Sequence, residues 1–324
     1  MDKTTIALTA TVVVLGVTIL FIIILVVIYS IRYRKLVAAL SVVIDNDIFC
    51  EIQEGVCRLE IDEELVEPTT VDGIFRYDVS RYCADIIARV ELLFYKKNGL
   101  TKLHMPRQLE LDTTLFFKNK IIGFVAKSRD TGSIWIAFRG TANESEWRQD
   151  FNFSQVDMTL SDTENQNNFA LRNGEVLSCH SGFLNVFNEF KECMLESLRR
   201  LNPEKIIVTG HSLGASLATL ASLELASQYE NVYTYAFASP RVCDRIPPIT
   251  SAFFRLSNTE DVVTTIPLSV MPNTFDKNRP YIYTHGGTSM EFTDNRKSLT
   301  NNHLLVGYIN AIDKRKIKQV TALY

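Results

Sequence analysis

The stretch from Ile206 to Gly214, IIVTGHSLG, decides the fold of this 324-residue chain. Its first part, Ile206–Thr209, is an apolar run that predicts a buried strand, and the Ala- and Leu-rich residues 215–229 that follow have helical spacing. Between them, residues 210–214 have the pattern G-x-S-x-G. A strand, a sharp turn and a helix around this pattern are typical of a nucleophile elbow, whose strained turn exposes the serine above a sheet. Ser212 is therefore the candidate nucleophile.

Helices and strands are predicted to alternate along the rest of the chain. Apolar periodicity and turn signals predict helices over 77–95, 189–201 and 303–312, a hairpin over 120–127 and 133–138, and strands over 232–238, 252–256, 281–284 and 288–292. The buried strands are almost wholly apolar, which indicates a sheet covered on both faces. The predicted fold class is α/β, with a mostly parallel sheet flanked by helices.

A serine nucleophile needs a histidine base, and two histidines qualify. In this fold the chain order is serine, acid, histidine, so His285 and His303 remain of the five histidines. His303 follows the polar loop 300–302 at the start of the last predicted helix, where a base can reach over the serine. His285 ends a strand, where a structural histidine fits better. We therefore favour His303.

The base in turn needs a carboxylate, which fixes its tautomer and stabilises its cation. Asp261 follows the predicted strand 252–256 through a short turn, and sites on open α/β sheets are built just past the carboxyl ends of strands. Glu260 and Asp244 are the rivals. Glu260 is adjacent and points elsewhere if Asp261 points in, and Asp244 fits a turn or cap.

Two backbone donors are expected to hold the oxyanion that forms when the serine attacks. One is the N–H of Leu213, directly after the nucleophile. The second is expected at the end of the strand 133–138, where Thr141 offers an N–H and a hydroxyl. The alternative role for Thr141 is an ordinary helix cap for the segment around Trp147.

With these residues in place, the chain resembles the class 3 lipases, the fungal-type lipases of the α/β-hydrolase fold. The resemblance covers roughly residues 110–312 and follows the order of the family's motifs. The matching pieces are Phe138-Arg139-Gly140-Thr141, Trp147 and Asp150, His180-Ser181-Gly182-Phe183, the elbow, Ala238-Ser239-Pro240-Arg241-Val242, Asn258-Thr259-Glu260-Asp261-Val262, Pro267, and His303 with Tyr308.

The resemblance implies Ser212, Asp261 and His303 as the triad, Thr141 and Leu213 as the oxyanion hole, and hydrolysis of acyl esters in lipids. It also implies a lid over about residues 142–155, with these candidate residues: Trp147, Asp150, Phe151 and Phe153. No cofactor is implied.

The N-terminus is predicted to be a membrane anchor. Residues 4–31 carry no charge, and about 20 apolar residues span a bilayer. A cleaved signal peptide would have a shorter apolar region and a small-residue cleavage site. We therefore expect an anchor over 1–35 (helix about 6–31), a juxtamembrane region over 36–75 whose acidic run 60–67 is a surface segment or linker, and a lipase-like domain over 76–324.

The orientation of this single-pass anchor follows from its flanks. Arg32, Arg34 and Lys35 follow the apolar stretch, so the positive-inside bias places the large domain on the cytoplasmic side of the membrane. The six cysteines lack C-x-x-C spacing and fit free thiols in a reducing compartment, with a Cys50–Cys57 bridge as the exception on an oxidising side. The glycosylation patterns at Asn143 and Asn152 occur at about the frequency of chance.

Composition limits the partners. The formal charge of −3 gives no basic balance for nucleic acid, and the five histidines lack metal-ligand spacing. The expected partners are a lipid ester substrate and the bilayer that holds the anchor. The leading hypothesis is a membrane-anchored lipase of acylglycerol or phospholipase A type. An acyltransferase or small-ester esterase on the same triad, and a non-catalytic interaction module on a hydrolase scaffold, are the alternatives.

Overall fold

The computed structural model describes Leu59 and residues 61–95, 103–140, 153–160, 176–247, 251–273, 276 and 278–320. The chain divides into two compact units, residues 1–50 and residues 51–324, and every element below belongs to the second. The predicted anchor helix over about residues 6–31 lies outside the described residues. Among the helices that are described, none combines the length and apolar character needed to cross a membrane.

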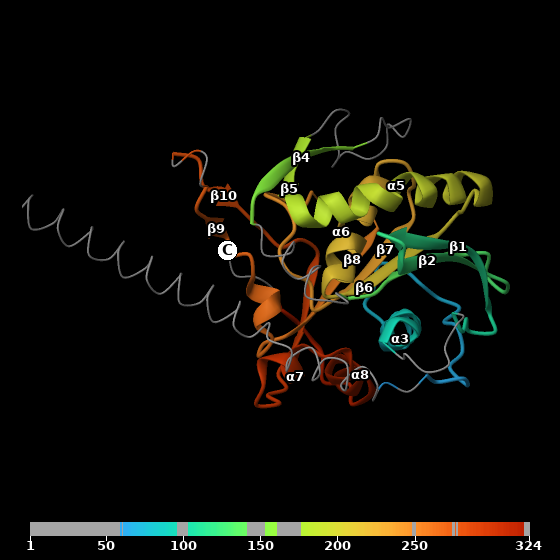
Figure 1. Cartoon of the computed structure of the whole chain (residues 1–324). Coiled ribbons are helices and arrows are strands. Elements are labelled where there is room, and N and C mark those ends of the chain that lie inside the picture. Colours follow the sequence, from blue (N-terminus) through green and yellow to red (C-terminus); the bar gives the residue numbers. More distant parts are fainter. Residues whose placement is uncertain are drawn as a thin grey trace, which may run out of the picture. The chain divides into compact units, whose positions relative to one another are not determined.

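An eight-stranded sheet forms the centre of the second unit, in the order β1-β2-β3-β6-β7-β8-β11-β12 (Figure 1). The strands β3, β6, β7, β8 and β11 pair in parallel, and β1, β2 and β12 pair antiparallel at the edges. The bounds are Leu109–Phe117 (β1), Lys120–Ser128 (β2), Ile134–Phe138 (β3), Ile206–His211 (β6), Val232–Phe237 (β7), Ala252–Asn258 (β8), Thr288–Phe292 (β11) and Lys318–Val320 (β12).

Two small antiparallel sheets lie outside the central one. The strand β4 (Gln155–Thr159) pairs with β5 (Val176–His180), and β9 (Val270–Met271) pairs with β10 (Tyr281–Ile282).

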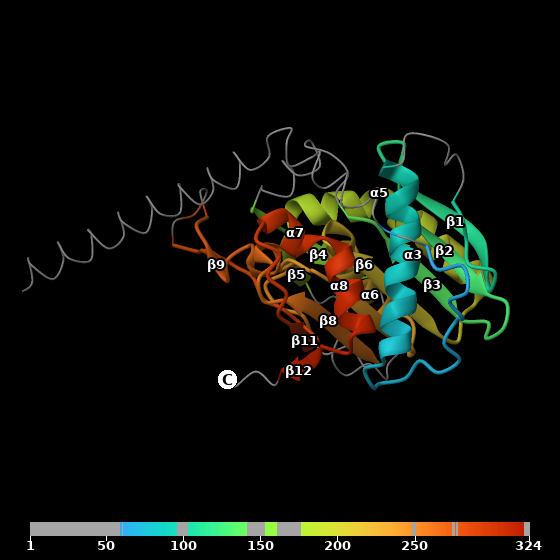
Figure 2. The same ribbon diagram turned by 90° about the horizontal axis from the view of Figure 1, so that it is seen from below.

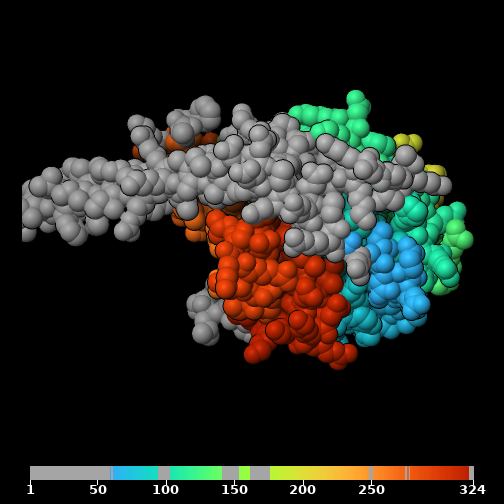
Figure 3. Space-filling model, turned by 60° about the horizontal axis from the view of Figure 1, so that its bottom comes forward, coloured from blue at the N-terminus to red at the C-terminus, as the bar shows by residue number. Residues whose placement is uncertain are grey.

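Helices cover both faces of the central sheet, as the apolar strands require. On one face lie α5 (Ser181–Leu201) and α6 (Leu213–Ala226), and on the other lie α3 (Tyr77–Tyr95) and α8 (Leu305–Asp313) (Figures 1 and 2). Figure 3 shows the α3 face in space-filling form, with the segment before α3 in blue and the C-terminal residues in red. The α/β class and the helix-flanked, mostly parallel sheet are confirmed.

The last predicted helix is not continuous. Residues 305–312 of the predicted helix lie in α8, as expected, but His303 ends a separate short helix, α7 (Leu299–His303), and Leu304 between the two has an extended backbone with φ −63° and ψ 137°. The residue that ends α7 is His303, the candidate base, so the break frees its carbonyl group from helical hydrogen bonding. The apolar periodicity of residues 303–312 could not reveal this break, because Leu304 fits a helix by residue type.

The acidic segment before α3 ends in a buried carboxylate. The side chain of Glu67 accepts hydrogen bonds from Trp135 Nε1 at 2.8 Å, Ser128 Oγ at 2.7 Å and Thr131 Oγ1 at 3.2 Å. Glu63 and Glu64 are exposed as a surface segment requires, but Glu67 is only 4% exposed, so the surface prediction is wrong for this residue. Its three contacts fasten the segment to the β2–β3 hairpin.

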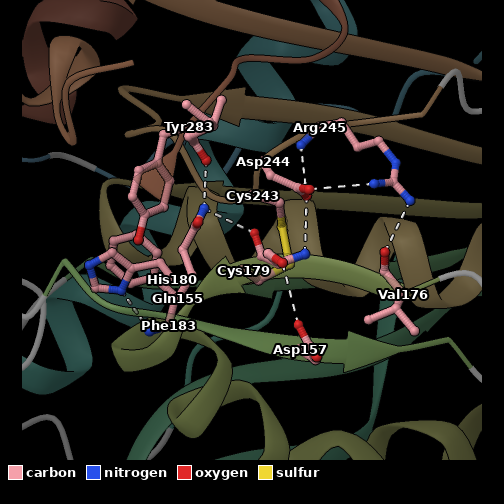
Figure 4. Close-up of a disulfide and its surroundings, with 12 residues drawn as sticks. Gln155, Asp157, Val176, Cys179, His180, Phe183, Cys243, Asp244, Arg245 and Tyr283 are labelled. Atoms are coloured by element: carbon pink, nitrogen blue, oxygen red, sulfur yellow. Dashed lines mark hydrogen bonds and ion pairs between the residues drawn. A yellow bond between two sulfur atoms is a disulfide. The ribbon is translucent and has the colours of Figure 1, made fainter. Parts of the chain in front are cut away.

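The prediction of free thiols is wrong for two of the cysteines. Cys179 at the end of β5 and Cys243 after β7 form a disulfide (Figure 4). Their backbones pair as an isolated antiparallel bridge, a contact between residues 64 positions apart that sequence spacing does not show. Cys83 is a buried free thiol and Cys193 an exposed one, while Cys50 and Cys57 lie outside the described residues.

The contacts of Glu67 lead to a prediction for stability. Glu67→Ala removes the acceptor of the buried Trp135 indole N–H, and we expect it to lower the free energy of unfolding by about 1–3 kcal/mol. Glu67→Gln keeps an acceptor for the indole N–H, so its free energy of unfolding should be close to that of the wild type. Burial raises the pKa of Glu67 despite its three hydrogen bonds, so the wild type should lose stability relative to Glu67→Gln as the pH rises through that pKa.

Urea denaturation of the three proteins at two pH values measures these differences. Equal unfolding free energies for the wild type and Glu67→Ala would contradict the prediction.

Candidate active site

Ser212 lies on a sharp turn between the end of β6 and the start of α6. Its backbone has φ 58° and ψ −123°, a conformation that a residue with a side chain adopts only when its surroundings impose it. The glycines on either side make the turn possible. A Cβ on Gly210 would lie 2.1 Å from the carbonyl oxygen of Gly214, and a Cβ on Gly214 would lie 2.4 Å from the carbonyl oxygen of Phe138. The structure therefore has the nucleophile elbow that the sequence pattern predicts.

His303 reaches the serine from the end of α7. Its Nε2 lies 2.7 Å from Ser212 Oγ, and its Nδ1 lies 2.8 Å from Asp261 Oδ2. An ionised carboxylate only accepts hydrogen bonds, so Nδ1 carries the proton and Nε2 is free to accept the proton of the serine hydroxyl. This is the tautomer that a general base for Ser212 requires.

Asp261 follows β8 and precedes the short 3-10 helix η1 (Val262–Thr265). It is 1% exposed. Its Oδ2 accepts a second hydrogen bond from Tyr308 Oη at 2.8 Å, and its Oδ1 accepts one from the N–H of Val263 at 3.0 Å. Three donors aimed at the carboxylate hold it in a fixed orientation.

Tyr308 on α8 connects this carboxylate to the loop after β8. Its hydroxyl donates to Asp261 and accepts from the N–H of Asn258 at 3.2 Å. Burial and the nearby Asp261 charge raise the pKa of Tyr308 well above its usual value, so the phenol keeps the proton that it donates. The sequence motifs included Tyr308, but gave it no role.

The rivals weighed from the sequence lie elsewhere. His285 Nε2 contacts the carbonyl oxygen of Thr264 at 2.7 Å, and burial, together with Arg255 and Arg241, lowers the pKa of His285 to about 3. The carboxylate of Glu260 accepts from Asn295 Nδ2 at 2.9 Å.

The third rival, Asp244, belongs to the surroundings of the disulfide. Its Oδ1 accepts from the N–H groups of Ser178 and Arg245 (Figure 4). The structure thus brings Asp261 to the histidine, and neither of the alternative carboxylates.

The expected oxyanion donors are described only in part. The N–H of Leu213 stands at the first position of α6, beside Ser212, where the helix dipole favours negative charge. Thr141 lies outside the described residues, as do three of the four candidate lid residues, Trp147, Asp150 and Phe151.

The fourth candidate lid residue is Phe153, which is half-buried. Its ring lies 6.1 Å from that of His180, and its carbonyl oxygen accepts from Tyr283 Oη at 3.1 Å. Its role in a lid stays a prediction.

Two side chains next to the triad have no role in the sequence analysis. Glu91 on α3 and His211 in the elbow form a buried pair directly behind the triad, with Glu91 Oε1 3.1 Å from His211 Nδ1. A carboxylate on the apolar stripe of the predicted helix 77–95 was the available signal, since a buried charge needs a partner. Within the described residues, no group of His, Cys, Asp or Glu side chains is arranged to hold a metal ion.

The fold and this geometry define an α/β-hydrolase with a Ser-His-Asp arrangement. Residues 135–271 match the family model for class 3 lipases, so this part of the chain is similar to that family. Among solved structures, MDLA from Penicillium cyclopium aligns with 76% of this chain and 85% of its own, at 18% identity and a TM-score of 0.51. That likeness shows the fold.

The relatives include enzymes named for lipid hydrolysis. The chain is 28% identical over 200 residues to a chloroplastic phospholipase A(1) of Arabidopsis thaliana, covering 53% of this chain and 44% of that protein. It is 29% identical over 161 residues to a secreted mono- and diacylglycerol lipase of Fusarium solani, covering 46% and 44%. A putative lipase of Saccharomyces cerevisiae is 32% identical over 131 residues, covering 37% and 39%. The chain thus spans less than half the length of these three relatives.

The elbow geometry predicts a steric effect. Gly214→Ala places a methyl group within 2.5 Å of the carbonyl oxygens of Phe138 and Arg139, so β3 or α6 must shift. We expect a loss of about 1–3 kcal/mol in the free energy of unfolding, as for other overpacked sites. The matched control is Gly73→Ala, because a Cβ on Gly73 meets nothing within 4 Å. Thermal unfolding should separate the two variants, and an unchanged midpoint for Gly214→Ala would refute the steric argument.

Proposed function

We propose that this chain is a lipid ester hydrolase that works through an acyl-enzyme on Ser212. One observation carries the proposal: an unbroken hydrogen-bonded chain from Ser212 Oγ through His303 to Asp261, with the serine on a strained elbow. Burial of all three side chains strengthens these contacts, because the surrounding dielectric is low. The class 3 lipase match supports esters as the substrate.

The reaction follows from the positions of the protons. Ser212 Oγ attacks the ester carbonyl carbon while its proton moves to His303 Nε2, and Asp261 stabilises the imidazolium that forms. The carbon–oxygen bond to the alcohol breaks, and the alcohol leaves with that proton. Water then attacks the acyl-enzyme, with His303 again taking the proton, and the fatty acid leaves as Ser212 is restored.

The negative charge on the tetrahedral intermediate needs donors that are already in place. We propose the N–H of Leu213, supported by its position at the start of α6, and the N–H and hydroxyl of Thr141. Phe138 ends β3 and pairs in parallel with Gly210, and Gly140, two residues further along, lies next to His211 in the elbow. The segment that leads to Thr141 therefore starts at the carboxyl end of the parallel strands, the same end of the sheet as Ser212.

The proposed substrates are acylglycerols or phospholipids of the phospholipase A type. The support is the naming of the relatives, which include a phospholipase A(1) and mono- and diacylglycerol lipases. A membrane tether over residues 6–31 fits such substrates, because it would raise the concentration of the enzyme at the lipid surface. The uncharged stretch of residues 4–31 is the support for this tether.

We further propose that the lipase domain faces an oxidising compartment. The basic residues 32, 34 and 35 favour the cytoplasmic side, but the bias rests on few charges. The Cys179–Cys243 disulfide is the stronger signal, because reducing systems keep cytosolic thiols reduced.

A serine-directed probe tests the proposed chemistry. We expect a fluorophosphonate to label the full-length chain and Ser212→Ala to abolish labelling and lower turnover by about 10⁶-fold, as in other serine hydrolases that lose the nucleophile. Turnover of dispersed glycerolipids, phospholipid vesicles and a soluble short-chain ester then identifies the substrate class. Equal labelling of the wild type and Ser212→Ala would exclude Ser212 as the nucleophile, and no labelling or turnover by either would leave a non-catalytic module.

Thiol labelling tests the compartment. In membranes isolated without reductant, we expect an alkylating reagent to modify the exposed Cys193 and to spare Cys179 and Cys243 until a reductant is added. Cys193 serves as the internal control for reagent access. Modification of all three before reduction would place the domain in a reducing compartment and support the cytoplasmic side.

A further inference from the structure

A second carboxylate–imidazole pair lies behind the triad and is not used by the chemistry above. Glu91 comes from α3, and His211 is the residue that precedes the nucleophile. Their side chains are 4% and 7% exposed, and Glu91 Oε1 lies 3.1 Å from His211 Nδ1. The helix α3, which carries Glu91, lies beside α8 on one face of the sheet (Figure 2).

Both ring nitrogens of His211 face acceptors. Nε2 lies 2.8 Å from the carbonyl oxygen of His303, which can only accept, so Nε2 carries a proton. Nδ1 faces the Glu91 carboxylate, which also accepts. An imidazolium ion satisfies both contacts at once, whereas a neutral ring satisfies only one of them.

The charges around His211 favour this cationic form. Burial alone would lower the pKa of His211, but Glu91, the His303 carbonyl group and Asp261 together raise it. The other groups that face the ring are the imidazole of His303, at 4.9 Å between ring centroids, and the phenol of Tyr308, at 6.0 Å. Of these neighbours, Glu91 alone touches His211 with a charged atom.

The contact with His303 is made to its main chain. Because α7 ends at His303 and Leu304 is extended, the carbonyl group of His303 points out of the helix and accepts from His211. Glu91 Oε1 also lies 3.4 Å from the N–H of Gly140, at the end of β3. One carboxylate therefore contacts the elbow and the strand end that leads to Thr141, and through His211 it reaches the loop that carries the base.

We propose that Glu91 and His211 are positioning residues, an ion pair that fixes the main chain of His303 so that its imidazole stays between Ser212 and Asp261. This inference rests on the proposed function. Glu91 lies outside residues 135–271, the segment that matches the family model.

The pair gives turnover a dependence on pH with a definite sign. A histidine with a raised pKa keeps its contacts below that pKa and loses them as the pH rises through it. When His211 loses its Nδ1 proton, a lone pair faces the Glu91 carboxylate and the two side chains separate. The neutral ring still donates from Nε2 to the His303 carbonyl oxygen, but it is no longer anchored on Glu91 and holds the His303 loop less firmly, so kcat should fall on the alkaline side.

Glu91→Gln in the full-length chain tests this. The amide has the same shape and can donate to a neutral His211, so the contact persists without the charge. We expect kcat for a soluble short-chain ester to fall about 10-fold at neutral pH, as when other residues that orient a functional side chain are replaced. We expect little change in KM. The alkaline decline should disappear. The matched control is Asp85→Asn, a buried carboxylate on the same helix that pairs with Arg89 at 2.8 Å, away from the elbow.

The proposal would be overturned if Glu91→Gln kept the kcat of the wild type and its decline at alkaline pH. It would also be overturned if Asp85→Asn lowered kcat and lost the alkaline decline in the same way. A second measurement keeps the inference testable if Glu91→Gln does not fold. Nitrogen-15 NMR of histidine in Ser212→Ala should show both ring nitrogens of His211 protonated at neutral pH, and a neutral ring would overturn the proposal. Failure of the proposed function is recognised separately, by a wild type that neither hydrolyses esters nor reacts with a fluorophosphonate.

Discussion

The backbone conformation of Ser212 is the constraint on which the rest of the site depends. A positive φ at a residue with a side chain is unfavourable on its own, and here β6 and α6 impose it from both sides. The turn leaves no room for a Cβ at Gly210 or Gly214, so α6 approaches the end of β3 to van der Waals contact. Every residue of α6 is buried, which makes the helix a rigid support. The serine therefore has a fixed position against which the other groups are set.

The remaining groups come to this fixed point from distant parts of the chain. Asp261 arrives from the end of β8, and His303 from a short helix that stops one residue later. Tyr308 and Glu91 come from the two helices on the opposite face of the sheet from α6. Each makes more than one contact, to groups that are themselves held by others, so the geometry is determined several times over. Such redundancy is what holds reacting groups within the narrow tolerances of catalysis.

The sequence was sufficient where the signal is local. The G-x-S-x-G pattern, the apolar β6 and the helix over 77–95 are each visible in one short stretch of sequence, and the order rule together with the placement of the candidates favoured Asp261 and His303. The structure places these where the prediction required. The sequence failed where the deciding contact joins distant segments. The burial of Glu67 depends on Trp135, the disulfide joins residues 64 apart, and the break at Leu304 accompanies a contact made by His211. Periodicity in the sequence does not show which of these distant residues are in contact.

The Glu91–His211 contact limits how the sequence can change at these two positions. The two residues are 120 positions apart, and in the proposed ion pair their opposite charges compensate each other in the core. A substitution at one position therefore affects what the other position can hold. A recombinant in which only one of the two residues is replaced by a neutral one would leave the other charge without compensation in the core. Substitutions at the two positions should show strong epistasis, and chimeras of this fold should tolerate a crossover between α3 and β6 only when the pair is exchanged together.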